Sequence, residues 1–124
     1  MFNNDFFALW DRDFPGSCGF RYLSALAAQA QDKIHELEDD KRAEWDAIDA
    51  DIGRLDDAAF KRFGGFDWPD DVKAQYDELD AQYYEAQDVY YSTSEVAGLF
   101  DDLVPALREV TGILERLERL RYKG

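Results

Sequence analysis

Apolar residues between Asp70 and Leu114 recur in alternating steps of four and three. This spacing is typical of a helix that packs along another helix. Asp71, Glu78 and Glu85 run beside the apolar line at intervals of seven, so an acidic stripe accompanies it. The apolar line consists of Val72, Tyr76, Leu79, Tyr83, Ala86, Tyr90, Ala97, Phe100, Val104, Leu107 and Leu114.

The first half of the chain carries a second apolar line with the same spacing, which predicts a long helix that begins near Phe20. Lys41 interrupts the line, but its aliphatic stem can lie along apolar surface while the amine stays in water. A helix from Phe20 to Ile52 is about 50 Å long and needs a partner of similar length. The line consists of Leu23, Ala27, Ala30, Ile34, Leu37, Trp45, Ile48, Ile52 and Leu55.

Breaks in these patterns predict where the helices end. Gly53, followed by Asp56 and Asp57, predicts an interruption of the first long helix, and Gly64-Gly65 predicts the hinge before the second. Before the first helix, Asn3 or Asn4 can cap a short helix that the Phe14-Pro15-Gly16 breaker ends. That short helix would carry Phe6, Phe7, Leu9 and Trp10 as apolar positions packed on the main bundle.

Two features interrupt the second long helix. Ser92 and Glu95 have the spacing of a capping box, which predicts a new helix or a bend. Pro105 follows Asp101 and Asp102, so we expect a cap at one of these aspartates and a separate final helix to about Tyr122.

No pattern favours β-strands, because alternation with a period of two and hairpin turn sequences are absent. The sequence therefore predicts an all-α fold. We expect a helical bundle built on two long antiparallel, coiled-coil-like helices, with shorter N- and C-terminal helices, in a single domain over residues 1–124. Heptads look alike within one chain and between two, so a homodimer is left open.

Charge changes this picture from a plain bundle to an acidic one. The 124 residues include 28 Asp and Glu against 14 Lys and Arg, a formal net charge of −14. Residues 32–102 hold 22 acidic and 7 basic residues, so the excess is local. Such a region repels nucleic acid and anionic membranes and attracts basic proteins. We therefore expect a basic protein as partner, with no direct nucleic-acid or membrane binding.

The sequence also bears on compartment. Cys18 is the single cysteine, which fits a reducing compartment. Residues 1–14 do not have the charge pattern of a secretory signal, and no apolar run has the 18 or so residues of a membrane span. We expect a cytoplasmic protein, in the cytosol of a host cell.

Catalytic and metal-binding patterns are weak. A di-iron bundle needs two Glu-x-x-His pairs, whereas His35 is the sole histidine and forms one Asp32-x-x-His35 pair. In a calcium loop that starts near Asp49, Gly53 falls one place early and no glutamate follows at the right distance. Cys18 and His35 lack any orienting motif for nucleophilic catalysis. We expect no enzymatic activity, no cofactor and no metal.

The acidic helix faces are the remaining candidate site. Carboxylates three or four residues apart on a helix are about 4.5 to 6 Å apart along its axis. Their charge density is comparable with that of the phosphates of duplex DNA. Tyr84 and Tyr91 each follow a residue of the apolar line by one position and have acidic residues around them. An arginine-rich partner could bind there through cation–π contacts with the tyrosine rings and hydrogen bonds to the carboxylates. Alternatively, the acidic residues form a solvated face, and the tyrosines belong to a wide core or to a dimer contact. The predicted partner-binding residues are Asp32, Glu36, Asp39, Asp40, Asp46, Asp49, Asp71, Asp77, Glu78, Tyr84, Glu85, Asp88 and Tyr91.

In size, charge and helicity the chain is similar to small acidic proteins of phages and mobile elements, namely anti-restriction DNA mimics and some anti-CRISPR proteins. Those proteins block the nucleic-acid channel of a defence enzyme, and the similarity transfers no individual residues. It implies a DNA-mimic inhibitor that occludes a basic nucleic-acid-binding surface. The alternative is a helical adaptor, secretion chaperone or coiled-coil assembly subunit that binds through apolar and tyrosine faces.

Overall fold

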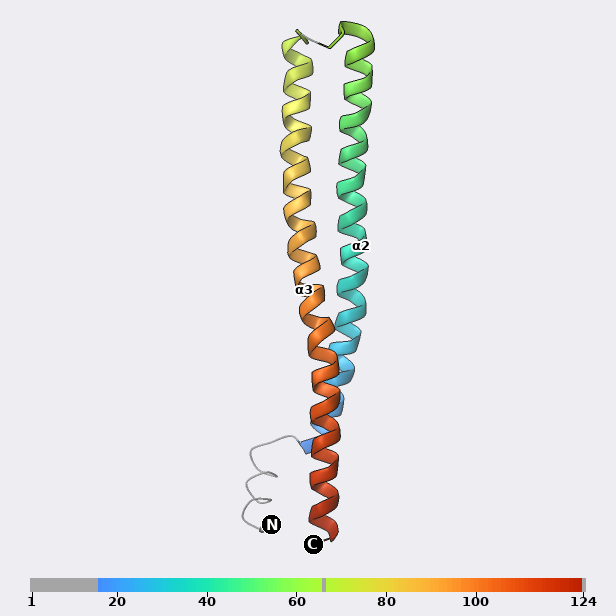
Figure 1. The fold of residues 1–124 in the computed structure, drawn as a ribbon, viewed down its shortest axis with the longest axis vertical. Helices are drawn as coiled ribbons and strands as arrows, with labels where there is room; N and C mark the ends of the chain where they lie inside the picture. Colours follow the sequence, from blue (N-terminus) through green and yellow to red (C-terminus); the bar gives the residue numbers. More distant parts are fainter. Residues whose placement is uncertain (1–15, 66, 124) are drawn as a thin grey trace. The chain divides into compact units, whose positions relative to one another are not determined.

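Two long helices packed against each other form the fold (Figure 1). A computed structural model describes residues 16–65 and 67–123 of the chain, and this part is all-helical apart from one short connection. Helix α2 spans Gly16–Phe63 and helix α3 spans Asp70–Lys123. The predicted short helix before Phe14-Pro15-Gly16 lies outside the described residues.

Helix α3 packs along the line that the sequence predicts. All eleven apolar residues of the line between Val72 and Leu114 are buried or half-buried, so this prediction is confirmed. Thr93 and Thr111 fill the gaps in the pattern and keep the steps of four and three unbroken. The hydroxyl of each donates a hydrogen bond to the carbonyl four residues earlier, at 2.8 and 2.7 Å, which satisfies a polar group inside the contact line.

The predicted final helix near Pro105 and the new helix at Ser92 are wrong, because α3 is one continuous helix over Asp70–Lys123. The bend that Ser92 and Glu95 also allow stays a prediction. The helix continues through Ser92 to Ser94 because Thr93 bonds back to its own helix and the contact line runs on to buried Ala97. It also continues through Pro105, although proline removes one backbone hydrogen bond in a helix interior. Pro105 is exposed, so water can solvate the freed carbonyl, while Val104 beside it is fully buried.

Helix α2 differs from the prediction at both of its ends. It begins at Gly16, whose φ of 72° suits glycine, rather than near Phe20. It then continues through Gly53, where the sequence predicts an interruption, and ends at Phe63. Ile52 and Leu55, on either side of Gly53, both stay in the half-buried contact line. Packing of these residues outweighs the weak helix propensity of a single glycine.

Polar residues displace predicted apolar ones from the contact line of α2. Ser17 and Ser24 are buried, whereas Leu23 and Leu37 are 44% and 41% exposed, so their assignment to the contact line is wrong. The Ser17 hydroxyl donates to Glu118 Oε2 at 2.6 Å, and the Ser17 backbone N–H donates to Glu118 Oε1 at 2.9 Å. These bonds fix a rotation of α2 that hydrophobicity alone does not indicate.

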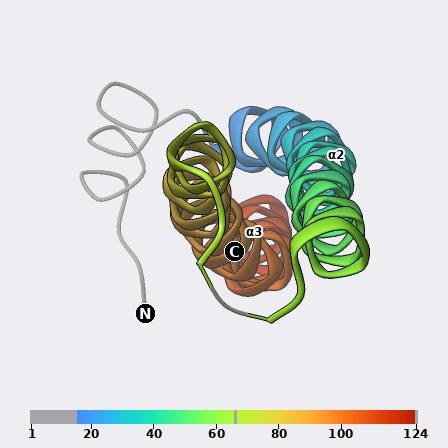
Figure 2. The ribbon, with the colours of Figure 1, turned by 90° about the horizontal axis from the view of Figure 1, so that it is seen from above.

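The connection between the helices is short and closed by local hydrogen bonds, and Figure 2 looks down onto it. Gly64 has a φ of 80° and donates its N–H to the Phe60 carbonyl at 2.9 Å, a left-handed helix end that favours glycine. The Trp68 indole N–H donates to the Gly64 carbonyl at 2.9 Å, and its ring lies 6.1 Å from that of Tyr76. The predicted hinge at Gly64-Gly65 is therefore confirmed, since α2 ends at Phe63.

The chain divides into two compact units, each built from a part of both helices. In the terminal unit, residues 16–33 of α2 pack on residues 97–123 of α3, with Ala27, Val104 and Leu114 in its core. In the central unit, the rest of α2 packs on residues 70–96 of α3, with Ala59 buried. A single domain over residues 1–124 stays a prediction.

Candidate protein-binding surface

The two units differ sharply in charge. The central unit, residues 34–96, contains 19 acidic and 6 basic residues, a net charge of −13. The described residues of the terminal unit contain 6 acidic and 7 basic residues, a net charge of +1. The acidity of the chain is therefore a property of the central unit.

All thirteen predicted partner-binding residues are exposed in the structure. Within the part of the chain that the structure describes, Asp46 is the one carboxylate of that set in a salt bridge, at 3.3 Å from Arg42. Glu44 and Asp51, outside the set, pair with Lys41 and Arg54. The other predicted carboxylates leave their charge open to solvent or to a partner.

The structure does not gather these residues on one face of either helix. In the structure the half-buried contact line of this part of α2 runs through Glu38, Lys41, Trp45 and Ile48. Three predicted residues follow a position of this line by one, whereas Asp40 precedes Lys41; the three are Asp39, Asp46 and Asp49. Glu36 lies on the outermost positions of α2, and Asp32 belongs to the terminal unit. Successive helical residues are about 100° apart, so a residue that follows the contact line is rotated to one side of it and a residue that precedes the line is rotated to the other. Asp39 and Asp40 therefore lie on different sides of the contact line.

Helix α3 repeats this separation. Asp77, Tyr84 and Tyr91 follow contact-line residues by one position. Each residue of the acidic stripe at intervals of seven instead precedes a contact-line residue by one position, so the stripe lies on the other side of the line. Asp88 faces outward. The sequence located the acidic residues, but only the contact line of each helix shows which of them share a flank. The stripe consists of Asp71, Glu78 and Glu85.

An aromatic cluster forms the centre of the central unit. The Trp45 ring lies 5.7 Å from that of Tyr83, 5.5 Å from Tyr90 and 5.8 Å from Tyr91, measured between centroids. Tyr84 stands edge-on to Tyr83 at 5.4 Å. Tyr84 and Tyr91 are 56% and 57% exposed, so the cluster extends from the helix contact to the surface.

Arg42 covers this cluster with its guanidinium. Its Cζ lies 5.2 Å from the Trp45 ring centroid and 5.4 Å from that of Tyr90, within the range of cation–π attraction. The pKa of Arg42 is raised, first by its interaction with Tyr90 and then by Asp46. Arg42 is not among the residues that the sequence predicts to bind a partner. Its position three residues before Trp45 was the available signal, because residues three apart share a helix face.

The Trp45 indole N–H is buried and has no hydrogen-bond partner. A buried donor left without a partner costs about 1–3 kcal/mol. Trp45 is therefore held by its ring contacts with the tyrosines and Arg42, and its polar atom adds nothing to stability.

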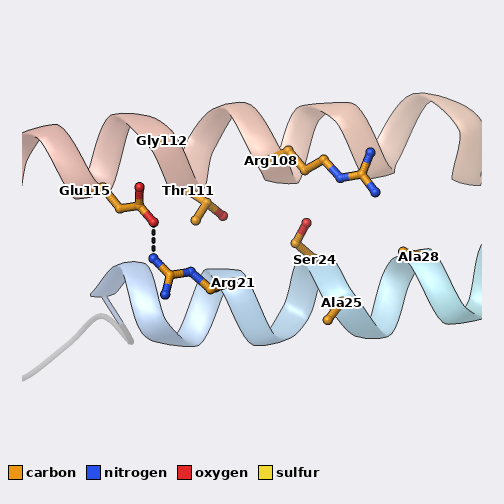
Figure 3. Close-up of a pocket in the computed structure, with 8 residues that line it drawn as sticks. All are labelled: Arg21, Ser24, Ala25, Ala28, Arg108, Thr111, Gly112 and Glu115. Carbon is orange, nitrogen blue, oxygen red and sulfur yellow. Dashed lines mark hydrogen bonds and ion pairs between the residues drawn. The ribbon is translucent and has the colours of Figure 1, made fainter.

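The terminal unit has a shallow groove with a volume of about 390 Å³ (Figure 3). Arg21 and Glu115 form an ion pair across it, and the Glu115 carboxylate raises the pKa of Arg21. The Thr111 hydroxyl, which also lines the groove, donates to the Leu107 carbonyl. The groove is lined by Arg21, Ser24, Ala25, Ala28, Arg108, Thr111, Gly112 and Glu115.

Metal chemistry finds no site in the described ranges. His35 Nδ1 lies 3.2 Å from Glu38 Oε1, one turn along the same helix. Over residues 16–65 and 67–123, no group of three or more His, Cys, Asp or Glu side chains is placed to hold a metal ion. Neither described helix contains a segment long and apolar enough to cross a bilayer.

Comparison with known proteins adds no assignment: no protein-family model, curated protein or solved structure matches this chain.

Proposed function

We propose that this chain is a non-enzymatic acidic binding protein whose central unit occupies a basic nucleic-acid-binding surface of a partner protein, as a DNA-mimic inhibitor of the anti-restriction or anti-CRISPR class does. The observation that carries the proposal is the segregation of charge. The central unit has a net charge of −13, and the described terminal unit has +1. Solubility alone does not require such a concentration of like charge, which destabilises the unit that carries it.

The charge density supports this proposal. The 30 residues of α2 in the central unit rise about 45 Å, so the unit carries about one net negative charge per 3.5 Å. Duplex DNA carries about one per 1.7 Å over both strands. The central unit therefore reaches roughly half the linear charge density of DNA on a rigid helical support.

The antiparallel direction of the two helices is part of the proposal. The contacts of the terminal unit support it, since Ser17 bonds Glu118 while Gln31 bonds Asp101. In an antiparallel pair, residues that follow the contact line lie on the same side of both helices. We call this side of the central unit the tyrosine side, formed by Asp39, Asp46, Asp49, Asp77, Tyr84 and Tyr91. The opposite glutamate side contains Asp40, Asp71, Glu78 and Glu85.

Of the two sides, the tyrosine side fits an arginine-rich partner better. Arg42 already places a guanidinium against the Trp45 and Tyr90 rings while pairing with Asp46. This contact demonstrates the combination of aromatic face and carboxylate that an incoming arginine would use at Tyr84 or Tyr91. The glutamate side offers carboxylates without exposed aromatic rings.

Matched neutralisation tests this assignment. The variant D39N/D46N/D49N/D77N removes four charges from the tyrosine side, and D40N/D71N/E78Q/E85Q removes four from the glutamate side. Tagged proteins are used to capture partners from nuclease-treated bacterial lysate at low and high salt. We expect the wild type to retain a basic nucleic-acid-binding protein at low salt and release it at high salt, because exposed ion contacts are screened.

The glutamate-side variant should retain the same protein, whereas the tyrosine-side variant should lose it. Helical circular dichroism checks that both variants are folded. Capture that is insensitive to salt, or that survives the tyrosine-side substitutions, contradicts the proposal. Equal weakening by both variants would show a general charge effect and contradict the assignment to the tyrosine side.

The exposed apolar residues favour the second candidate function, a helical adaptor, secretion chaperone or coiled-coil assembly subunit. Tyr84 and Tyr91 are the largest exposed groups of the central unit's tyrosine side. That function predicts that Y84A/Y91A abolishes capture of the partner more completely than D39N/D46N/D49N/D77N does. The same capture experiment therefore separates the two candidates.

A further inference from the structure

The terminal unit has an apolar line on α3 beside the contact with α2, and all of its members except the half-buried Leu117 are exposed. Leu99 is 63% exposed and Ile113 is 54% exposed. The members from Leu99 to Ile113 each precede a contact-line residue of α3 by one position, and Leu117 and Leu120 continue the same spacing. The line therefore forms a second heptad seam about a quarter turn from the first. The line consists of Leu99, Leu103, Ala106, Val110, Ile113, Leu117 and Leu120.

Helix α2 extends this line into a face. Leu23 and Leu26 are exposed and precede the contact-line residues Ser24 and Ala27 by one position. The groove of Figure 3 is lined instead by residues that follow the contact line, such as Ala25 and Ala28. In an antiparallel pair the preceding residues of both helices lie opposite that groove. We call this surface the apolar face, formed by Leu23, Leu26, Leu99, Leu103, Val110, Ile113 and Leu120.

The apolar face is long and narrow. From Leu99 to Leu120 it rises about 32 Å on a helix of about 10 Å diameter. The α3 line alone covers about 320 Å², and Leu23 and Leu26 widen one end of it, so the face is smaller than the roughly 800 Å² that each partner contributes to a standard interface.

Charge indicates which partner fits. The described terminal unit has a net charge of +1, so two copies of it do not repel each other as two central units would. Along the edge of the apolar face, Asp102 and Glu109 come first and Arg116 follows at the same spacing of seven. A parallel copy would place like charges together at all three positions, whereas an antiparallel copy does so only at Glu109. An antiparallel copy brings Asp102 of each chain opposite Arg116 of the other.

We propose that the apolar face binds a second copy of this chain, with the two α3 helices antiparallel to each other, in a four-helix contact between terminal units. In this pairing Leu103 packs near Ile113 of the second copy, and Leu99 packs near the half-buried Leu117 at the end of the face. Glu109 meets its own counterpart at the two-fold axis. The proposal concerns the terminal unit and does not depend on what the central unit binds.

Sedimentation equilibrium of the full chain over a range of concentrations tests the pairing. We expect a monomer–dimer equilibrium in the wild type and a monomer in L99D/I113D, because a carboxylate in the face is desolvated without a partner. Phe60 is 65% exposed in the central unit, outside the face, so F60D is the matched control and should dimerise like the wild type. A monomeric wild type, or a dimer unaffected by L99D/I113D, overturns the proposal.

A charge exchange tests the antiparallel direction. D102R and R116D should each weaken the dimer about tenfold, since each places like charges opposite one another. D102R/R116D should return the dissociation constant to within about threefold of the wild type, because it restores both opposite-charge contacts. Additive weakening in the double variant overturns the antiparallel pairing. Folding of every variant is followed by circular dichroism.

Discussion

Trp45 shows how one residue connects the packing of the central unit to its surface. The ring touches three tyrosines and carries Arg42, so it joins the half-buried contact line to the exposed Tyr91. Its indole N–H contributes no hydrogen bond. The residue therefore acts through the area and face of its ring, and its polar atom is dispensable.

Substitution of Trp45 separates these two contributions. W45F keeps an aromatic ring and removes the unpartnered N–H, so we expect it to change the free energy of unfolding by less than about 1.5 kcal/mol. W45A removes the ring contacts and should cost about 3 kcal/mol. Urea denaturation followed by circular dichroism measures both values. Equal losses in the two variants would show that the ring contacts are not what Trp45 supplies.

At the scale of the helices, tertiary packing overrides local breakers. Gly53 and Pro105 both lie inside continuous helices, on exposed positions between residues of the contact line. Gly64 behaves differently, because its φ of 80° lies in the left-handed region and it ends α2. The backbone conformation of a glycine, and not its presence, decides whether a helix stops there.

Alanine substitutions test this contrast between Gly53 and Gly64. No atom lies within 4 Å of a Cβ added at either position, so the backbone alone sets the outcome. G53A should raise the free energy of unfolding by about 0.5–1 kcal/mol through helix propensity. G64A should lower it by about 1 kcal/mol, because an L-residue is strained at positive φ. Chemical denaturation of the two single variants measures the difference; the same sign for both would contradict this explanation.

For the whole molecule, the distribution of charge is the dominant feature. The central unit's charge of −13 opposes its own compact state, and the described terminal unit is close to neutral. The two proposals use this division: the acidic unit meets a basic protein, and the neutral unit meets a second copy. Each surface suits a chemically different partner.

Salt should therefore stabilise the protein. Raising sodium chloride from about 0.05 to about 0.5 M shortens the Debye length from roughly 14 to 4 Å and screens repulsion within the central unit. We expect the melting temperature of the wild type to rise over this range. The rise should be smaller in D40N/D71N/E78Q/E85Q, which carries four fewer negative charges. A melting temperature that falls with salt would show that attractive ion pairs outweigh the repulsion.

Much of the fold was predictable because the apolar period of α3 is long and regular. All eleven predicted contact positions of that helix are at least half-buried, and Gly64-Gly65 follows the end of α2 as expected. The register of α2 was not predictable from hydrophobicity, because Leu23 and Ser24 are neighbours and the serine is the buried one. The new helices predicted at Ser92 and near Pro105 are wrong, because packing over many turns outweighs local capping signals.

The candidate surface was predictable as a set of exposed acids and tyrosines, but not as a shape. Asp39 and Asp40 are adjacent in sequence, and the contact line sends them to opposite flanks. The cluster of Arg42 on Trp45 and Tyr90 joins two helices, so spacing along one helix does not reveal it.

The sequence by itself determined the all-helical class, the acidity of the middle of the chain and the contact line of α3, because each depends on composition or on period along one helix. The tertiary structure alone decided the rotation of α2 and the continuity of both helices. It also showed that the leucines of the apolar face, such as Leu23 and Leu99, stay exposed while Ser17 and Ser24 are buried. Those outcomes depend on which side of a helix meets its partner, and hydrogen bonds such as that of Ser17 with Glu118 fix that side across 101 positions of sequence.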